Sequence, residues 1–402
     1  MSQAALDALP LVVAALAAAA LVSFVLTPLA IRAAPRLGAI DLPDTDAATG
    51  RRVHRKPIPR TGGLAVAGSF VIVGALGLIA NQVFQVALPG RPVRTTEVAA
   101  LFAGVSVGAV IGYLDDRFEL KARWQFIAQF LLAGIALVGG ITINRLPNPL
   151  GEVAIPLTDF AAVAATTLWI VGMINSVNFV DGLDGLLAGI ALIAVTTMGV
   201  ISLIAAPVQP VVAMLCALLA GSLLGFLPYN FHPARVFIGT AGVFAVGYAL
   251  AVLSVLGTAK VAVALLVLGV PIIDTFWIII RRVSSGRSPF SADRGHFHHR
   301  LLDLGLSHRQ VVLLIYLICT VLAVLSVVLS GQGQISVFLI VVLAGGLVLY
   351  LLTRRAREAL DRRSYPEQNE PEALDAVRDV GTGLVGLPDD DAPPPEPPEV
   401  NR

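Results

Sequence analysis

The chain alternates between long apolar runs and short polar segments over most of its length. A transmembrane helix needs about 20 consecutive apolar residues, and the sequence holds about eleven runs near that length. We therefore expect an all-α polytopic membrane protein of about eleven transmembrane helices. The fifth run is short and contains threonine, so a re-entrant or interfacial segment is the alternative there. The expected spans are residues 9–31, 62–81, 97–114, 124–145, 158–175, 184–205, 208–227, 237–257, 259–280, 310–330 and 333–353.

The composition agrees with this class. Hydrophobic residues make up 56% of the chain and charged residues 14%, and the mean hydropathy is +0.82. These values are not typical of a soluble globular domain. The two cysteines, Cys216 and Cys319, lie inside apolar runs, which indicates small buried side chains rather than a redox or metal site.

Basic residues gather in alternate loops. The loops 32–61, 115–123, 228–236 and 281–309 together hold 17 Lys and Arg, whereas the loops on the other side hold 4. Loops rich in Lys and Arg stay in the cytoplasm. We therefore expect a multi-pass protein of the cell (inner or plasma) membrane with its N-terminus outside and its C-terminus in the cytoplasm.

The end of the chain differs from the rest. Residues 354–402 contain 7 basic and 12 acidic residues and include DDDAPPPEPPEV near their end. A segment of this composition cannot bury a core. We expect residues 1–355 to form the membrane domain and residues 356–402 to form an acidic, proline-rich, disordered cytoplasmic tail.

The chemically reactive side chains fall on one side of the expected membrane. The carboxylate well inside a span is Asp274, whereas a transporter would be expected to line its midplane with ionisable groups. The distribution favours a membrane enzyme with its active site on the cytoplasmic face. The residues in the expected cytoplasmic loops include all six histidines and five aspartates: His54, His232, His296, His298, His299, His308, Asp115, Asp116, Asp181, Asp184 and Asp293.

Two adjacent carboxylates, Asp115 and Asp116, end the third span. Their mutual repulsion is relieved by a cation or a proton. Mg²⁺ is often held by one or two carboxylates together with substrate phosphates. The alternative is a solvated helix end whose carboxylates pair with Arg117 or Lys121.

The segment NSVNFVDGLDG, residues 175–185, places two amides and two carboxylates between long apolar runs. Asp181 and Asp184 are three residues apart and would share one face of a helix, beside Asn175 and Asn178. Polar side chains near a membrane are costly and are usually functional. Helix capping by the carboxylates is the alternative.

Two basic loops suit phosphate oxygens. RRVHRKPIPRTGGLA, residues 51–65, can present guanidinium and backbone N–H groups to an anion, although an ordinary basic loop is the alternative. DRGHFHHRLLDLGLSHRQ, residues 293–310, is rich in histidine. With no cysteine nearby, its His and Arg side chains suit a diphosphate better than zinc.

Taken together, these motifs resemble the polyprenyl-phosphate N-acetylhexosamine-1-phosphate transferases, the glycosyltransferase 4 group. They follow the family order over residues 15–355, and the GHFHHR form is more similar to the bacterial branch that uses UDP-N-acetylglucosamine than to the branch that uses UDP-muramoyl-pentapeptide. The motifs are VHRKPIPRTGG, GYLDDR, NSVNFVDGLDGL, RVFIG-AG, GTAK, PIIDT and DRGHFHHRLLDLGLSHRQ.

The resemblance implies a reaction and its participants. Undecaprenyl or decaprenyl phosphate would attack the β-phosphate of a UDP-N-acetylhexosamine, most closely UDP-N-acetylglucosamine, to give a polyprenyl-diphospho-sugar and UMP. This step initiates cell-envelope polysaccharide synthesis. Mg²⁺, or Mn²⁺ in its place, would bridge the diphosphate. The implied partners are the two substrates and the lipid bilayer, without nucleic acid, and a homodimer is common in the family.

The resemblance also implies residue roles. Asp115 and Asp116 would handle the lipid phosphate and the metal, and Asp181 and Asp184 would orient the metal and the nucleotide. The implied supporting residues are Asn175 and Asn178 beside these carboxylates, Lys56 and Arg60 near the phosphates or nucleotide, His296, His298, His299 and Arg300 on the diphosphate or sugar, and Asp274 in a supporting role.

One position departs from the family pattern F-x-G-D-x-G-S. The chain reads FIGTAGV, with Thr240 where the family has an aspartate that is a principal Mg²⁺ ligand, and Val243 where serine is common. A threonine hydroxyl can coordinate Mg²⁺ weakly, as in P-loops, but it brings no negative charge. Three interpretations stay open: the other carboxylates hold the metal more weakly, the chain is a catalytically impaired lipid- or nucleotide-binding or scaffold protein, or Thr240 is an artificial change. We expect an active transferase.

Overall fold

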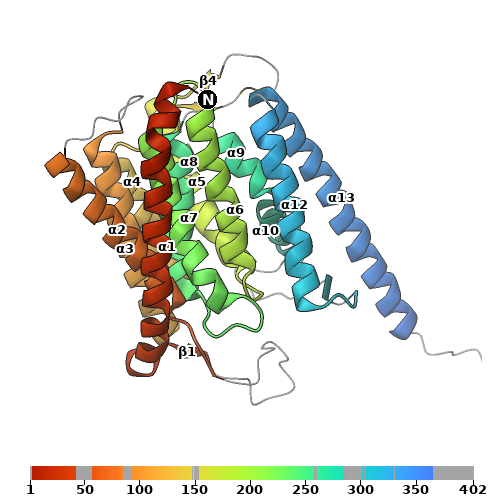
Figure 1. The fold of residues 1–402 in the computed structure, drawn as a ribbon. Helices are drawn as coiled ribbons and strands as arrows, with labels where there is room; N and C mark the ends of the chain where they lie inside the picture. The colour runs from red at the N-terminus through yellow and green to blue at the C-terminus, as the bar shows by residue number, and fades with distance from the viewer. Residues whose placement is uncertain are drawn as a thin grey trace, which may run out of the picture. The chain divides into compact units, whose positions relative to one another are not determined.

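The computed structural model describes residues 2–41, 57–84, 93–146, 148, 154–257, 260–284, 286, 301–302, 304–329 and 331–364. These residues are mostly α-helical (Figure 1). Two short antiparallel strand pairs join loop segments, β1 with β2 and β3 with β4. The elements in chain order are α1 (Gln3–Leu37), β1 (Ile40–Asp41), β2 (Ile58–Pro59), α2 (Gly62–Phe84), α3 (Thr95–Phe118), α4 (Ala122–Val138), β3 (Arg145–Leu146), β4 (Ile155–Pro156), α5 (Asp159–Val180), α6 (Leu186–Ile204), α7 (Pro210–Asn230), α8 (Gly239–Leu256), α9 (Lys260–Val267), α10 (Gly269–Ser284), α12 (His308–Val328) and α13 (Gly331–Ser364).

The chain divides into two compact units, Met1–Leu349 and Tyr350–Arg402. The helix packing described below is that of the first unit. The second unit includes the end of α13, which runs to Ser364 and so passes the boundary expected after residue 355. The rest of the expected tail lies outside the described residues, and its disorder stays a prediction.

The expected all-α polytopic class is confirmed. Within the described ranges, 8 helices are long and apolar enough to cross a membrane, or up to 9 if one bent pair forms a single span. Asp159–Val180 is among the 8, which favours a span over the re-entrant alternative for that run. Ala122–Val138 and Gly333–Val348 are shorter apolar helices at the fourth and eleventh expected runs. The number of spans and the orientation of the termini stay predictions.

The ninth expected span, residues 259–280, is not one straight helix. Val261–Val267 and Ile272–Ile278 meet at an angle of 76°. Gly269 and Pro271 stand at the break. Glycine weakens a helix interior, and proline has no backbone N–H to continue the hydrogen-bond ladder. The second piece carries Asp274, which is buried.

Close packing of α1 on α7 depends on small residues (Figure 1). A Cβ atom on Gly221 would lie 2.2 Å from the backbone oxygen of Leu16, so only glycine allows this approach. One residue further on, the Ser23 hydroxyl donates a hydrogen bond of 2.6 Å to the carbonyl of Ser222. Small side chains at helix–helix contacts are typical of membrane proteins, where packing replaces the hydrophobic driving force.

Helix α8 lies at the centre of the packed helices. Its side chains are buried along nearly the whole helix, including Phe244 and Tyr248. The Tyr248 hydroxyl donates a hydrogen bond of 2.9 Å to the carbonyl of Ala100 on α3. The aromatic ring lies where a Cβ atom on Gly104 would stand. The position of α8 is therefore fixed against α3, and the beginning of α8 is fixed with it.

We expect Gly221→Ala to destabilise the protein by about 1–3 kcal/mol, because the added methyl group forces α1 away from α7. Thermal unfolding of the purified protein in detergent measures the change. Gly77→Ala is the matched control, since a Cβ atom there has nothing within 4 Å. Equal melting temperatures for the two variants would contradict this account of the α1–α7 contact.

Candidate active site

Polar residues gather where several helices begin or end. The C-terminal ends of α3, α5 and α7 and the N-terminal ends of α8 and α12 carry the aspartates, amides and histidines that the described part of the chain brings together. Helix ends leave backbone N–H and C=O groups without intrahelical partners. They are therefore the places in a helical membrane protein where charged side chains and ligands find hydrogen bonds.

Asp116 joins the end of α3 to the beginning of α8. Its Oδ1 accepts a hydrogen bond of 3.0 Å from the Thr240 N–H, and its Oδ2 accepts one of 3.0 Å from the Ala241 N–H. The Thr240 side chain also hydrogen-bonds this carboxylate. A helix N-terminus stabilises a carboxylate through these free N–H groups and the helix dipole. Thr240, the residue that departs from the family pattern, is thus in direct contact with Asp116.

The close approach at this point requires glycine. Gly239 has a φ of +66°, which favours glycine, and a Cβ atom there would lie 2.4 Å from the Arg60 carbonyl oxygen and 2.7 Å from Asp116 Oδ2. Because Gly239 has no side chain, the basic loop, the buried carboxylate and the first turn of α8 can meet.

The described part of the basic loop runs beside the segment that precedes α8. The Phe237 N–H donates to the Pro59 carbonyl at 2.8 Å, and the Gly63 N–H donates to the Ile238 carbonyl at 2.8 Å. These backbone bonds bring Arg60 to the site, where its charge interacts with Asp116 and Asp181. Arg60 also forms an ion pair with the buried Asp41.

Asp115 faces a different neighbour from Asp116. Its Oδ1 accepts hydrogen bonds of 3.1 Å from the Leu120 N–H and 2.8 Å from Gln125 Nε2. Both partners lie in or after the turn that connects α3 to α4. The two adjacent aspartates therefore diverge: Asp116 holds α8, and Asp115 holds the α3–α4 turn.

Asp181 ends α5, and its backbone N–H donates to the Asn178 carbonyl at 3.3 Å. Its carboxylate makes no hydrogen bond with the side chains and backbone that the structure describes. Loss of hydration, together with repulsion from Asp116 and Asp184, raises the pKa of Asp181 to about 7, although Arg60 opposes this. Asp181 is therefore the carboxylate of this group that is poised to accept a cation.

Asp184 has protein partners of its own. Its Oδ2 lies 2.7 Å from His232 Nδ1 and accepts a hydrogen bond of 3.1 Å from the Ala234 N–H. The sequence motifs indicated a role for Asp184 but none for His232. A contact between residues 48 positions apart leaves no local pattern that would have revealed it.

The amides predicted to support the carboxylates have separate environments. Asn175 on α5 and Gln129 on α4 pair through their amide groups, with an Asn175 Nδ2 to Gln129 Oε1 distance of 2.6 Å. Asn178 is exposed at the end of α5. The contact between Asn175 and Gln129 fixes α5 on α4, whereas the exposed Asn178 side chain can meet a ligand.

Asn230 is a site residue that sequence analysis missed. Its Oδ1 accepts a hydrogen bond of 3.1 Å from the Gly185 N–H, and its Nδ2 donates one of 3.0 Å to the Val236 carbonyl. The hydroxyl of Tyr316 on α12 donates to the Gly185 carbonyl. Asn230 thereby joins the DGLDG segment to the loop before α8. The sequence signal that could have indicated it was a polar residue at the end of an apolar run.

Five predicted site residues, Lys56, His296, His298, His299 and Arg300, lie outside the described residues. Their roles stay predictions.

The described residues contain no group of three or more His, Cys, Asp or Glu side chains placed to hold a metal ion. Mg²⁺ needs fewer protein ligands, because substrate phosphates and water supply the rest. Asp181 fits this kind of binding, because its carboxylate makes no hydrogen bond with a described residue and is repelled by Asp116. The residues present are therefore suited to a cation that arrives with a phosphorylated substrate.

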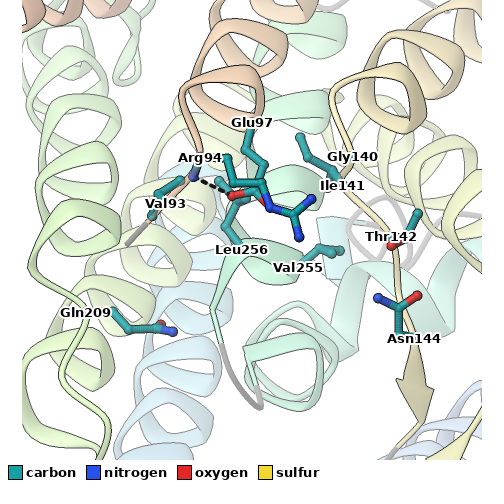
Figure 2. A pocket seen from close by; sticks show the side chains of 10 residues that line it. All are labelled: Val93, Arg94, Glu97, Gly140, Ile141, Thr142, Asn144, Gln209, Val255 and Leu256. Atoms are coloured by element: carbon teal, nitrogen blue, oxygen red, sulfur yellow. Dashed lines mark hydrogen bonds and ion pairs between the residues drawn. The ribbon is translucent and has the colours of Figure 1, made fainter. Parts of the chain in front are cut away.

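A cavity of about 390 Å³ lies at the opposite end of α3. Figure 2 shows Arg94 and Glu97 at its edge, where the Arg94 N–H donates to Glu97 Oε2 at 2.9 Å. Glu97 and Asp116 are 19 positions apart on this helix, a rise of roughly 30 Å. The expected site residues do not line this cavity, so its size alone does not make it the reactive site.

Comparison with known proteins gives consistent matches. Residues 98–258 match the profile of glycosyl transferase family 4. The chain is 37% identical over 347 residues to the probable undecaprenyl-phosphate N-acetylglucosaminyl 1-phosphate transferase of Bacillus subtilis, covering 83% of this chain and 89% of that protein. It is 35% identical over 371 residues to the decaprenyl-phosphate N-acetylglucosaminephosphotransferase of Mycobacterium tuberculosis, covering 85% and 89%.

We expect Asn230→Ala to lower the free energy of unfolding by about 1–3 kcal/mol, because the Gly185 N–H and the Val236 carbonyl lose their buried partner. Thermal unfolding in detergent measures this. Asn178→Ala, at an exposed position in the same region, should change stability by less than about 0.5 kcal/mol. A larger loss for Asn178→Ala than for Asn230→Ala would contradict the account.

The raised pKa of Asp181 implies a pH dependence of stability in the absence of divalent cations. Between the unfolded pKa of about 3.9 and the folded pKa, the folded state holds a proton that the unfolded chain has lost. This stabilisation is complete at low pH and disappears as the pH rises through about 7. We expect Asp181→Asn to be more stable than wild type at about pH 8, with a smaller difference at about pH 5. Equal differences at both pH values would contradict the assignment.

Proposed function

The chain belongs to glycosyl transferase family 4, and from this premise we propose that it transfers N-acetylglucosamine-1-phosphate from UDP-N-acetylglucosamine to undecaprenyl or decaprenyl phosphate. The products are polyprenyl-diphospho-N-acetylglucosamine and UMP, and the reaction begins the synthesis of a cell-envelope polysaccharide. Relatives that are 35–37% identical over most of the chain are named for this activity. They do not favour the alternative of a catalytically impaired binding or scaffold protein.

The structural observation that carries the proposal is the meeting of Asp116, Asp181 and Arg60 beside the first turn of α8. Two carboxylates and a guanidinium interact there, at helix ends rather than in a span interior. Phosphoryl transfer asks a protein mainly to position the phosphates and to balance their charge. This arrangement offers both signs of charge for that purpose.

The reaction balances without a further reactant. A phosphate oxygen of the lipid attacks the β-phosphorus of the UDP-sugar, and a new P–O bond forms. The bond breaks between the β-phosphorus and the oxygen that joins it to the α-phosphorus, and its electron pair leaves with UMP. Arg60 would attract the phosphate oxygens, and the neighbouring helix ends would exclude bulk water from them. A divalent cation held by Asp181 and Asp116, when bound, supplies further neutralisation of the diphosphate charge.

Thr240 determines how much negative charge the site holds. Its N–H and side chain both contact Asp116, so an aspartate at this position would add a carboxylate next to Asp116. With threonine there, cation binding would depend on Asp181 and Asp116 and would be weaker than with a third carboxylate. The substitution lowers the expected affinity for the cation but leaves the phosphate-binding groups in place.

The lysine and arginine distribution supports a cytoplasmic position for this site, on the side where nucleotide sugars are made. The lipid acceptor would reach it from the bilayer with its tail between the helices and lipid. The membrane location follows from the apolar helices. A homodimer stays a prediction from the family resemblance.

A direct assay tests the function. We expect purified protein to release UMP from UDP-N-acetylglucosamine when undecaprenyl phosphate and Mg²⁺ are present. Asp181→Asn should lower the rate by about 100-fold or more, because the divalent cation that would neutralise the diphosphate loses a charged ligand. Asp159→Asn, at the opposite end of α5, is the control and should keep the wild-type rate.

Two outcomes would overturn the proposal or part of it. UMP release by Thr240→Asp but not by wild type would show that the natural chain is inactive and that the missing carboxylate is the cause. An undiminished rate in Asp181→Asn would exclude the role given to Asp181.

A further inference from the structure

A second polar cluster lies beside the proposed site, where the DGLDG segment, the loop before α8 and the beginning of α12 meet. It consists of Asp184, His232, His308 and Arg309. The His232 ring stacks on the His308 ring with centroids 5.0 Å apart and an interplanar angle of 14°. Asp184 is also close enough to interact with the charge of Asp181. The cluster is thus electrostatically connected to the carboxylates described above.

The orientation of His232 is fixed by Asp184. A carboxylate accepts hydrogen bonds, so the contact of 2.7 Å between His232 Nδ1 and Asp184 Oδ2 makes Nδ1 the donor. The Ala234 N–H donates to the same Asp184 oxygen, which holds the carboxylate in place. His232 therefore has Nε2 as the ring nitrogen that remains for a ligand.

Exposure of the ring agrees with this assignment. The His232 side chain is 36% exposed, whereas that of Asp184 is 17% exposed. One edge of the ring is bonded to Asp184 and one face lies on His308. Nε2 makes no hydrogen bond with the residues that the structure describes, and the side chain is exposed enough for a ligand to reach the ring.

Arg309 adds positive charge next to the His232 backbone. Its Nη2 donates a hydrogen bond of 3.2 Å to the His232 carbonyl. Among the ion pairs of the described residues, Arg60 with Asp41, Arg94 with Glu97 and His232 with Asp184, none involves Arg309. A guanidinium has five N–H donors, so Arg309 has several that the described residues do not use and that suit an anion.

We propose that His232 and Arg309 form a phosphate-recognition site and that Asp184 is a positioning residue that acts through His232. The inference rests on the proposed function and names a further substrate contact for it. The ligand is a phosphoryl oxygen, supplied either by the diphosphate of UDP-N-acetylglucosamine or by the phosphate of the lipid.

Binding, rather than proton removal, is the role that the chemistry favours. A phosphate monoester already carries a charge of about −1.5 to −2 at pH 7. The attacking lipid phosphate therefore needs no base to make it a nucleophile. Hydrogen-bond donors are needed instead, to hold either the lipid phosphate or the diphosphate that it attacks. The imidazolium form of His232 carries an N–H on both ring nitrogens, so with Nδ1–H bonded to Asp184 it can donate Nε2–H to a phosphoryl oxygen, and the Arg309 guanidinium adds further donors.

Two substitutions at one position separate binding from a purely structural role. His232→Asn places an amide N–H where Nδ1 stands and so keeps the bond to Asp184, but it has no group at Nε2. His232→Gln extends an amide towards the Nε2 position and gives up the bond to Asp184. If His232 only held Asp184 in place, the asparagine variant would behave as wild type.

We expect His232→Asn to keep the wild-type melting temperature while the KM for one phosphorylated substrate rises roughly 10- to 100-fold, the loss expected for one charge-assisted hydrogen bond. His232→Gln should bind that substrate more tightly than His232→Asn does. UMP release is measured first while UDP-N-acetylglucosamine is varied at saturating undecaprenyl phosphate. It is then measured while undecaprenyl phosphate is varied at saturating UDP-N-acetylglucosamine. A raised KM for the first substrate identifies the donor diphosphate as the ligand, and a raised KM for the second identifies the lipid phosphate.

Calorimetric titration of each variant with UDP gives a readout that does not depend on turnover. An active wild type with unchanged KM values and unchanged UDP affinity in His232→Asn would overturn this inference and leave the proposed function standing. Absence of UMP release by wild type would instead overturn the proposed function.

Discussion

The hydrogen bonds from the first turn of α8 to the Asp116 carboxylate are the contact on which the arrangement of the site depends. A carboxylate buried without such partners would cost several kcal/mol. Here two backbone N–H groups satisfy it and join α3 to α8 across 124 residues of sequence. Gly239 lets the Arg60 backbone approach the same point. One set of contacts therefore brings together the Arg60 backbone, the Asp116 carboxylate and the N-terminal end of α8.

The membrane explains why these groups meet at helix ends. Inside the bilayer every polar group needs a partner from the protein itself. Hydroxyls within the helices meet this demand locally: Thr27 donates to the Ser23 carbonyl at 2.7 Å, and Ser202 donates to the Met198 carbonyl at 2.6 Å. Charged groups need more than this. They collect where helices end and where free N–H groups, water and substrate phosphates can reach them.

Sequence predicted the helical class and the gathering of aspartates in loops, since hydrophobic runs and charged breaks are local properties. Through the family resemblance, it also led us to expect Arg60 near the phosphates or nucleotide, which stays a prediction. It could not predict that Asp115 and Asp116 face different helices, or that Asp184 bonds His232. Those pairings depend on how distant helix ends pack. The break in the ninth run was missed because hydropathy does not distinguish a straight apolar helix from two joined at Gly269 and Pro271.

We propose that nucleotide and metal bind at the junction of α3, α5 and α8, and not in the cavity at the other end of α3. A cryo-electron microscopy structure of the protein with UDP and Mg²⁺ tests it most directly. We expect density for the diphosphate beside Asp181 and Arg60. Density in the cavity bordered by Arg94 and Glu97, with none beside Asp181, would contradict it.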